Sequence, residues 1–412
     1  MYVDHWLEVI DKWHEAPESC RARVLDEILN GKGVPEEVRA KLWIVSTGAQ
    51  QKKENSPGKY KELLAKECNA QVKHNIVKDL TRTFNLFPSA PTRKHRDASE
   101  LDLRKAYKGR GVDGKVFGQH ECALYNVLHA ISLQFPEIGY HQGMNFVAAM
   151  LLISLKQKED FKTLTRRTGA HEEENHLYSV KDDYNERAAN EWSSAEEDTF
   201  WVLSCMLKDY HLAGLYDINS SFLQQYVDQF DTLFRRFLPR LHHHLTLSLD
   251  PRLESILFAV DWFTTIFTYS VRLDAALVVW DCFLAARLDE AMYVSGLALL
   301  YSIADTKMLS NNFGEAIVQF RTYVREVNGK SMRSYLRKVV ERLVPSTLMP
   351  PGHSTLLRIE RQIADPQNPY ATSHYRATEL MQAVQLGKVE SVEAEVKKYA
   401  FPPRILENAL IK

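Results

Sequence analysis

Apolar residues recur at intervals of three and four along most of the chain, and this spacing constrains the fold more than any other feature. Such spacing places side chains on one face of an α-helix. Alternating strand patterns are scarce and no βαβ rhythm appears, so we predict an all-α fold. The clearest examples are Val3, Trp6, Ile10 and Trp13, then Ile256, Leu257, Val260, Phe263 and Phe267, and then Leu273, Leu277, Trp280 and Leu284.

Composition narrows the classes of function. Hydrophobic residues make up 45% and charged residues 25% of the 412 residues, an ordinary globular mixture. The formal net charge of −1 provides no global basic field for nucleic acid or an anionic membrane. No run approaches the ~18 apolar residues that a membrane span needs. We therefore expect no nucleic-acid partner and no integral membrane segment.

The five cysteines are widely separated and form no CxxC pair. This spacing indicates neither a zinc site nor a disulfide framework, and it favours a reducing, cytoplasmic location.

Breaks in the helical pattern suggest the domain organisation. Residues 1–32 form an N-terminal helical segment, and residues 33–345 form the main domain. A polar insertion is expected at about 157–194, and a long loop from about 89 to 118. Proline and glycine after position 344 end any helix, so residues 346–412 are expected to be a linker and a helical extension.

Part of this extension, Glu379–Val396, is similar to the helical half of an ankyrin repeat. An ordinary helical hairpin explains the segment as well, so the start of an ankyrin-like array remains one of two interpretations.

Several apparent motifs lack the context that their chemistry needs. Gly109–Gly114 fits GxGxxG, but no apolar strand precedes it. His171 and His176 are five residues apart, whereas a helical zinc pair needs four. His242–His244 is interpreted as a charged helix end. Trp280-Asp281 is a single WD dipeptide without a propeller repeat. We therefore predict no metal site.

Three short segments keep chemically informative residues. Arg39 and Trp43 lie four residues apart on one face of a predicted helix. Asp79 and Arg82 lie three apart, a spacing that alone favours a surface ion pair worth at most about 1 kcal/mol. A polar turn, Tyr140–Gly143, leads into a strongly apolar helix.

Together these segments resemble the TBC domain of Rab GTPase-activating proteins, whose motifs are RxxxW, IxxDxxRT and YxQ. The similarity covers roughly residues 33–345 and continues at 196–207, 258–267 and 277–284, although Asp261 stands where family members often have Glu. It implies an all-α domain of two helical subdomains. The matching residues are Arg39 and Trp43, then Ile76, Asp79, Arg82 and Thr83, then Tyr140 and Gln142.

The resemblance implies a GTPase activator that works in trans on a Rab-type GTPase in its GTP state. Arg82 would stabilise charge on the transferred phosphoryl group, a contribution on the order of 10³–10⁵ in rate for such fingers. Gln142 would orient the attacking water, because an amide both donates and accepts hydrogen bonds. The chain would need no cofactor of its own, since the partner carries GTP and Mg²⁺.

The remaining motif residues are expected to support these two. Asp79 would orient Arg82 and pair with Arg39, and Gly143 would let the backbone pass close to the partner. Ile76, Trp43, Thr83 and Tyr140 would be structural supports. The family also implies a role in vesicle trafficking and a position peripheral to endomembranes through the partner.

Two other functions compete with activation. A TBC scaffold could bind a GTPase without accelerating hydrolysis, although the presence of both finger residues disfavours it. An independent hydrolase with Asp79 as base would need a phosphate cradle or a metal cluster, and the sequence shows neither.

Overall fold

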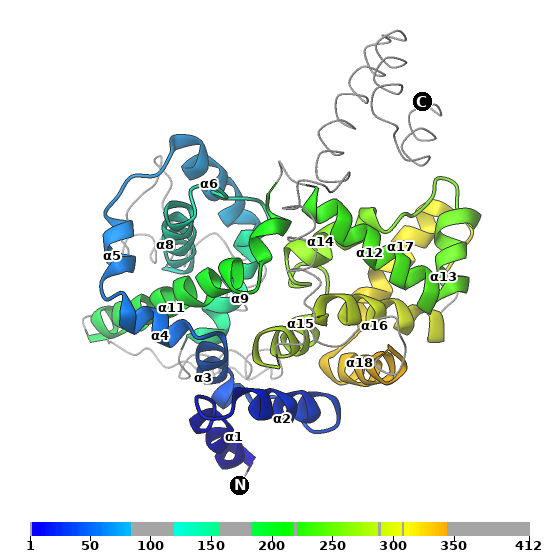
Figure 1. Ribbon diagram of the computed structural model, residues 1–412. Coiled ribbons are helices and arrows are strands. Elements are labelled where there is room, and N and C mark those ends of the chain that lie inside the picture. Colours follow the sequence, from blue (N-terminus) through cyan, green and yellow to red (C-terminus); the bar gives the residue numbers. More distant parts are fainter. Residues whose placement is uncertain are drawn as a thin grey trace, which may run out of the picture.

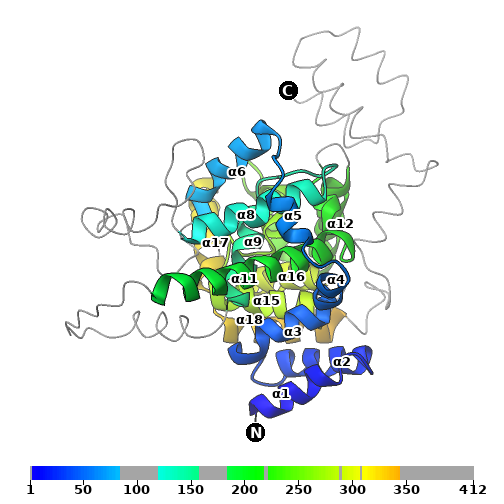
Figure 2. The ribbon, with the colours of Figure 1, turned by 90° about the vertical axis from the view of Figure 1, so that its left-hand side faces the viewer.

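The computed structural model describes residues 2–83, 119–156, 183–217, 221–286, 290–306 and 309–343. These ranges are helical and contain no strand, which confirms the predicted all-α class. The helices form two groups that lie side by side, with α3 at the lower end of the left-hand group (Figure 1). The turned view shows the first group in front of the second (Figure 2).

The first group is assembled around α9, Met144–Leu155, and α11, Asp183–Lys208. Almost every side chain of α9 is buried, because this helix is apolar on all sides rather than along one stripe. It contacts α3, α6, α8 and α11, and so forms the centre of the group. The other helices here are α3 (Glu36–Thr47), α4 (Ala49–Asn55), α5 (Lys59–Leu64), α6 (Ala70–Thr83) and α8 (Gln119–Gln134).

The second group is built on amphipathic helices. In α12 the aromatic side chains of Phe222, Tyr226, Phe230 and Phe234 recur every four residues and are buried, so one face of the helix enters the core. The group comprises a 3₁₀ turn (Leu212–Leu215), α12 (Phe222–Phe237), α13 (Pro239–His243), a π-turn (His244–Ser248), α14 (Ile256–Thr264), α15 (Leu273–Trp280), a second π-turn (Asp281–Ala285), α16 (Ala291–Thr306), α17 (Phe313–Glu326) and α18 (Gly329–Leu343).

The two N-terminal helices pack on this body rather than standing apart from it. Helix α1, Tyr2–Asp11, contacts α3, and helix α2, Pro17–Leu29, contacts α18 and the second π-turn. Trp6 and Trp13 are buried, as the spacing of the N-terminal apolar residues predicts.

The structure adds detail to one predicted segment and shortens another. Helix α11 begins at Asp183, so the last part of the expected 157–194 insertion is helical. Helix α14 ends at Thr264, three residues before the predicted Phe267, because Ile266 and Phe267 turn the chain at φ 46° and 62°. The rest of the insertion, the loop at 89–118, the GxGxxG-like stretch, the His171–His176 pair and residues 346–412 lie outside the described residues.

Candidate functional site

Gln142 is exposed at the entrance of the buried helix α9. On one side of it Tyr140 is buried, and on the other Gly143 and Met144 are buried. The short turn is tied down locally, since His141 Nε2 lies 2.9 Å from the carbonyl oxygen of Ile138. The exposed Gln142 is therefore carried by a turn in which Tyr140 and Gly143 are buried.

A buried contact joins this turn to α6. The hydroxyl of Tyr140 donates to Asp79 Oδ2 over 2.9 Å, and both residues are buried. Ile76, one turn earlier on α6, is completely buried. Asp79 is thus positioned by the aromatic residue of the YxQ motif, which links the second and third motifs directly.

A second chain of hydrogen bonds runs in parallel. Asn145 Nδ2 donates to Thr83 Oγ1 over 2.8 Å, and Thr83 Oγ1 donates to the carbonyl oxygen of Asp79 over 2.9 Å. The backbone N–H of Gly143 donates to Asn145 Oδ1 over 3.0 Å. We call Asp79, Thr83, Tyr140, Gly143 and Asn145 the turn network. Fully bonded polar clusters of this kind fix one arrangement of a buried region.

Gly143 is required by a contact within the chain. Its φ is 107°, which L side chains rarely adopt, and an added Cβ would lie 2.9 Å from the carbonyl oxygen of Thr264. The hydroxyl of Tyr216 donates to the same oxygen over 2.7 Å. Gly143 therefore makes a close approach to α14 within the chain, which fixes the turn against the second group of helices; the approach to the partner that was expected at Gly143 stays a prediction.

Arg82 is the penultimate residue of α6 and directly precedes Thr83 of the turn network. Its side chain lies outside the described part of the structure, so its role as a finger stays a prediction. The backbone of α6 nonetheless places Arg82 one residue from a side chain that is bonded to the turn carrying Gln142.

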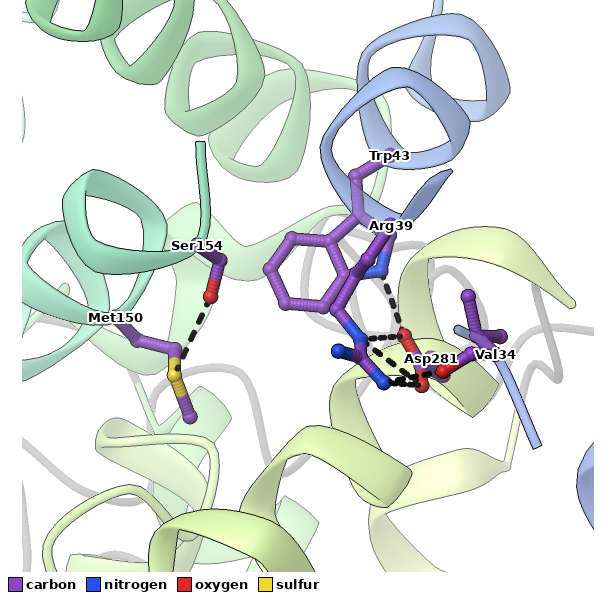
Figure 3. A network of polar contacts seen from close by, with 6 residues as sticks. All are labelled: Val34, Arg39, Trp43, Met150, Ser154 and Asp281. Carbon is purple, nitrogen blue, oxygen red and sulfur yellow. Dashed lines mark hydrogen bonds and ion pairs between the residues drawn. The ribbon is translucent and has the colours of Figure 1, made fainter. Parts of the chain in front are cut away.

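The expected pairing of Arg39 with Asp79 is wrong. Arg39 pairs instead with Asp281, with Nε 3.1 Å from Oδ1 and Nη2 3.2 Å from Oδ2, and its Nη2 also donates to the carbonyl oxygen of Val34. Trp43 Nε1 donates to Asp281 Oδ1 over 2.9 Å. Figure 3 shows Arg39 and Trp43 converging on this carboxylate. The arginine and tryptophan of the RxxxW motif therefore both bind the second π-turn.

We call Arg39, Trp43 and Asp281 the hinge cluster, because it joins α3 to the chain that follows α15. The rings of Trp43 and Trp280 stack with centroids 5.5 Å apart. Burial raises the pKa of the Asp281 carboxyl above its ordinary value, while Arg39 and Trp43 act against that shift by stabilising the charged form. A buried charge of this kind needs all of its partners.

Sequence reasoning missed two residues of these clusters. Asp281 was visible only as half of a WD dipeptide, and its partner lies 242 residues away. Asn145 had a clearer signal, because it is a polar residue in the otherwise apolar start of α9. Buried polar side chains usually have hydrogen-bonding partners, so its position indicated a buried network.

No cluster of three or more potential metal ligands occurs within residues 2–83, 119–156, 183–217, 221–286, 290–306 and 309–343. In these same ranges, none of the helices is long and apolar enough to cross a membrane.

Comparison with known proteins places this arrangement in a family. Residues 36–309 match the Rab-GTPase-TBC domain family. The chain is 27% identical over 284 residues to the TBC1 domain family member whacked of Drosophila melanogaster, covering 68% of this chain and 58% of that protein. It is 26% identical over 296 residues to mouse Carabin, covering 72% of this chain and 51% of Carabin. The chain thus spans about half the length of these curated relatives.

A solved structure agrees with the fold. The flagellar RabGAP TBC domain of Chlamydomonas superposes with a TM-score of 0.53 at 21% identity, over 79% of this chain and 86% of that one. At this identity the likeness shows the fold alone, whereas the sequence match extends over more than half of the chain. The chain belongs to the Rab-GTPase-TBC domain family.

Proposed function

We propose that this protein accelerates GTP hydrolysis by a Rab-type small GTPase in its GTP state, with Arg82 and Gln142 supplied in trans. Its family membership supports the class of partner. The observation that carries the mechanism is the exposure of Gln142 on a turn whose Tyr140 and Gly143 are buried and which is bonded to α6. An exposed side chain on so rigid a support is suited to act on a second molecule.

The chemistry divides between the two residues. Hydrolysis requires a positioned water and stabilisation of charge on the γ-phosphoryl oxygens. The Gln142 amide can accept a hydrogen bond from the water and donate one to a phosphate oxygen. The Arg82 guanidinium remains charged and can contact phosphate oxygens through two parallel N–H groups. GTP and Mg²⁺ belong to the partner.

The turn network supplies the preorganisation that this mechanism requires. Asp79 and Thr83 flank Arg82 on α6, and each is bonded to a residue of the turn on either side of Gln142. Buried contacts therefore join the backbone segments that carry Arg82 and Gln142, which supports a fixed spacing between them before the partner binds. Donors fixed before the reaction avoid reorganisation during it.

The direct test is single-turnover hydrolysis with a panel of GTP-loaded Rab GTPases. We expect stimulation of at least one GTPase and no hydrolysis of free GTP by the protein alone. Stable binding of a GTPase without stimulation across the panel would support the scaffold alternative. Hydrolysis without any GTPase would support an independent hydrolase. The proposal places the protein in the cytoplasm, at endomembranes through its partner, with a role in vesicle trafficking.

A further inference from the structure

The end of α12 and the segment after it carry a run of basic side chains that no acidic residue interrupts. Residues 232–249 contain three arginines and three histidines but no aspartate or glutamate. They cover the last turns of α12, all of α13 and the first π-turn. Figure 1 shows α13 at the edge of the second group, on the side away from α6, α8 and α9. The segment therefore lies apart from Gln142.

Local packing determines which side chains face outward here. Leu241, Leu245 and Leu249 recur every four residues and are buried. Arg240, His243 and Leu247 fall between them at spacings of three and four, and all three are exposed. Leu247 is 63% exposed, which is high for a leucine.

Three more arginines adjoin this face. Arg235 and Arg236 are exposed in the last turn of α12, which contacts α13. Arg252 is exposed beside the π-turn, because the N–H of Leu253 donates to the carbonyl oxygen of Leu245 over 2.9 Å. We call the surface formed by Arg235, Arg236, Arg240, Leu247 and Arg252 the basic ridge.

The guanidinium groups of the basic ridge are not neutralised by the surrounding described residues. None of the four makes an ion pair or side-chain hydrogen bond within the described ranges. Asp231, the acid that precedes the ridge in sequence, binds Ser255 at 2.7 Å and His242 at 3.1 Å through its Oδ1. Asp250 and Glu254 are exposed close by in sequence, so they offset only part of the positive charge.

We propose that the basic ridge docks this protein directly on an anionic phospholipid surface. Arginine forks can hold lipid phosphate groups by paired hydrogen bonds. Leu247, standing among them, can enter the boundary between head groups and acyl chains. Each basic residue close to an anionic leaflet contributes about fivefold to binding. The chain's net charge of −1 provides no global attraction to an anionic surface, so binding has to come from a local basic surface such as the ridge.

The exposed leucine distinguishes a membrane from other polyanions. A nucleic acid or an acidic protein surface could satisfy the same arginines through phosphate or carboxylate groups. The acyl boundary of a membrane also gives Leu247 an apolar environment. Binding should therefore depend on the charge and on the leucine together. This inference does not depend on the proposed GTPase activation.

The test is co-sedimentation of the full chain with vesicles of phosphatidylcholine alone or with phosphatidylserine added. We expect binding only to the anionic vesicles. Arg236→Glu with Arg240→Glu should weaken it on the order of tenfold or more, and Leu247→Ser should weaken it severalfold. The matched charge control is Lys330→Glu with Arg337→Glu, on exposed positions of α18. The matched apolar control is Val318→Ser, at a residue 64% exposed on α17.

Each outcome decides the inference. Docking through the basic ridge is supported if the two control variants still bind anionic vesicles and both ridge variants lose binding. Absence of wild-type binding, equal binding to phosphatidylcholine alone, or equal loss in the α18 control would overturn it. A loss confined to the arginine variant, with Leu247→Ser unchanged, would assign the ridge to a different polyanion. Arg236→Gln with Arg240→Gln, checked by thermal unfolding, separates lost binding from lost folding.

Discussion

The hinge cluster and the turn network use similar residues for different ends. Both combine a buried aspartate with an aromatic donor: Trp43 for Asp281, and Tyr140 for Asp79. In the hinge cluster the arginine also turns inward, and its guanidinium is shared between a carboxylate and a backbone carbonyl. In the turn network the neighbouring Gln142 is exposed.

Helix α9 connects the two regions, since it packs on α3 of the hinge cluster and on α6 of the turn network. In Figure 3, the ring of Trp43 lies between Met150 and Ser154 of α9 on one side and Asp281 on the other. Motifs of one family can therefore have different structural roles. A closed cluster stabilises the junction of helices, whereas a network that ends at the surface can present a reactive group.

The largest effect is expected in the hinge cluster. Asp281→Ala leaves the largely buried Arg39 guanidinium, 12% exposed, without its carboxylate and should lower the free energy of unfolding by about 3–5 kcal/mol. Stimulated hydrolysis per folded molecule should change little, because none of the hinge cluster's hydrogen bonds involves the turn network. Urea unfolding and single-turnover kinetics measure the two quantities.

Asp281→Asn is the matched control for this change. Its amide oxygen can still accept from Trp43, so the loss of stability should be smaller than for alanine. If Asp281→Ala were as stable as the parent, the hinge cluster would not hold the junction as described.

Arg82→Ala should produce the next largest effect, now on rate. Stimulated hydrolysis should fall on the order of 10²-fold or more, because the transition state loses a charged donor. Arg82→Lys should restore little, since an ammonium cannot reproduce the planar fork. Binding to the GTP-loaded partner should change less than the rate. If Arg82→Ala still stimulated hydrolysis almost fully, Arg82 would not be the arginine finger.

A smaller effect should follow Tyr140→Phe. Asp79 loses one donor, so stability should fall by about 1–3 kcal/mol, and stimulation should fall severalfold through a loosened turn. Tyr210→Phe is the matched control, because its buried hydroxyl donates to the carbonyl oxygen of Leu284, outside the turn network. Equal stimulation by the two variants would mean that the Tyr140 contact does not position Gln142.

The helices could be predicted from sequence because their buried faces repeat at short range. The predicted apolar positions include Trp6 and Ile10 of α1 and Trp280 of α15, which the structure buries, whereas Leu273 and Leu277 of α15 are half-buried. The end of α14 could not be predicted in this way. No glycine or proline marks Ile266 and Phe267, and both are completely buried in the turn that they form, so tertiary packing sets that boundary.

The candidate site, too, could be predicted from the sequence only in part. The exposed position of Gln142 followed from a polar turn before an apolar helix, and the structure agrees. The partner of Arg39 could not be deduced from the sequence, because Asp79 and the more distant Asp281 are both acidic and either could pair with an arginine. Periodicity reports which face of a helix is buried, but it does not report which helix covers that face.

Hydrolysis by a Rab GTPase whose own switch glutamine has been replaced tests directly whether Gln142 positions the attacking water. If Gln142 positions the water in trans, this GTPase should still respond to the wild-type protein. Gln142→Ala should then lose most of the stimulation while unfolding at the parent temperature, because substitution of an exposed side chain changes stability little. The water-positioning role of Gln142 would be contradicted by a protein that fails on the substituted GTPase and stimulates the unmodified one equally well with or without Gln142.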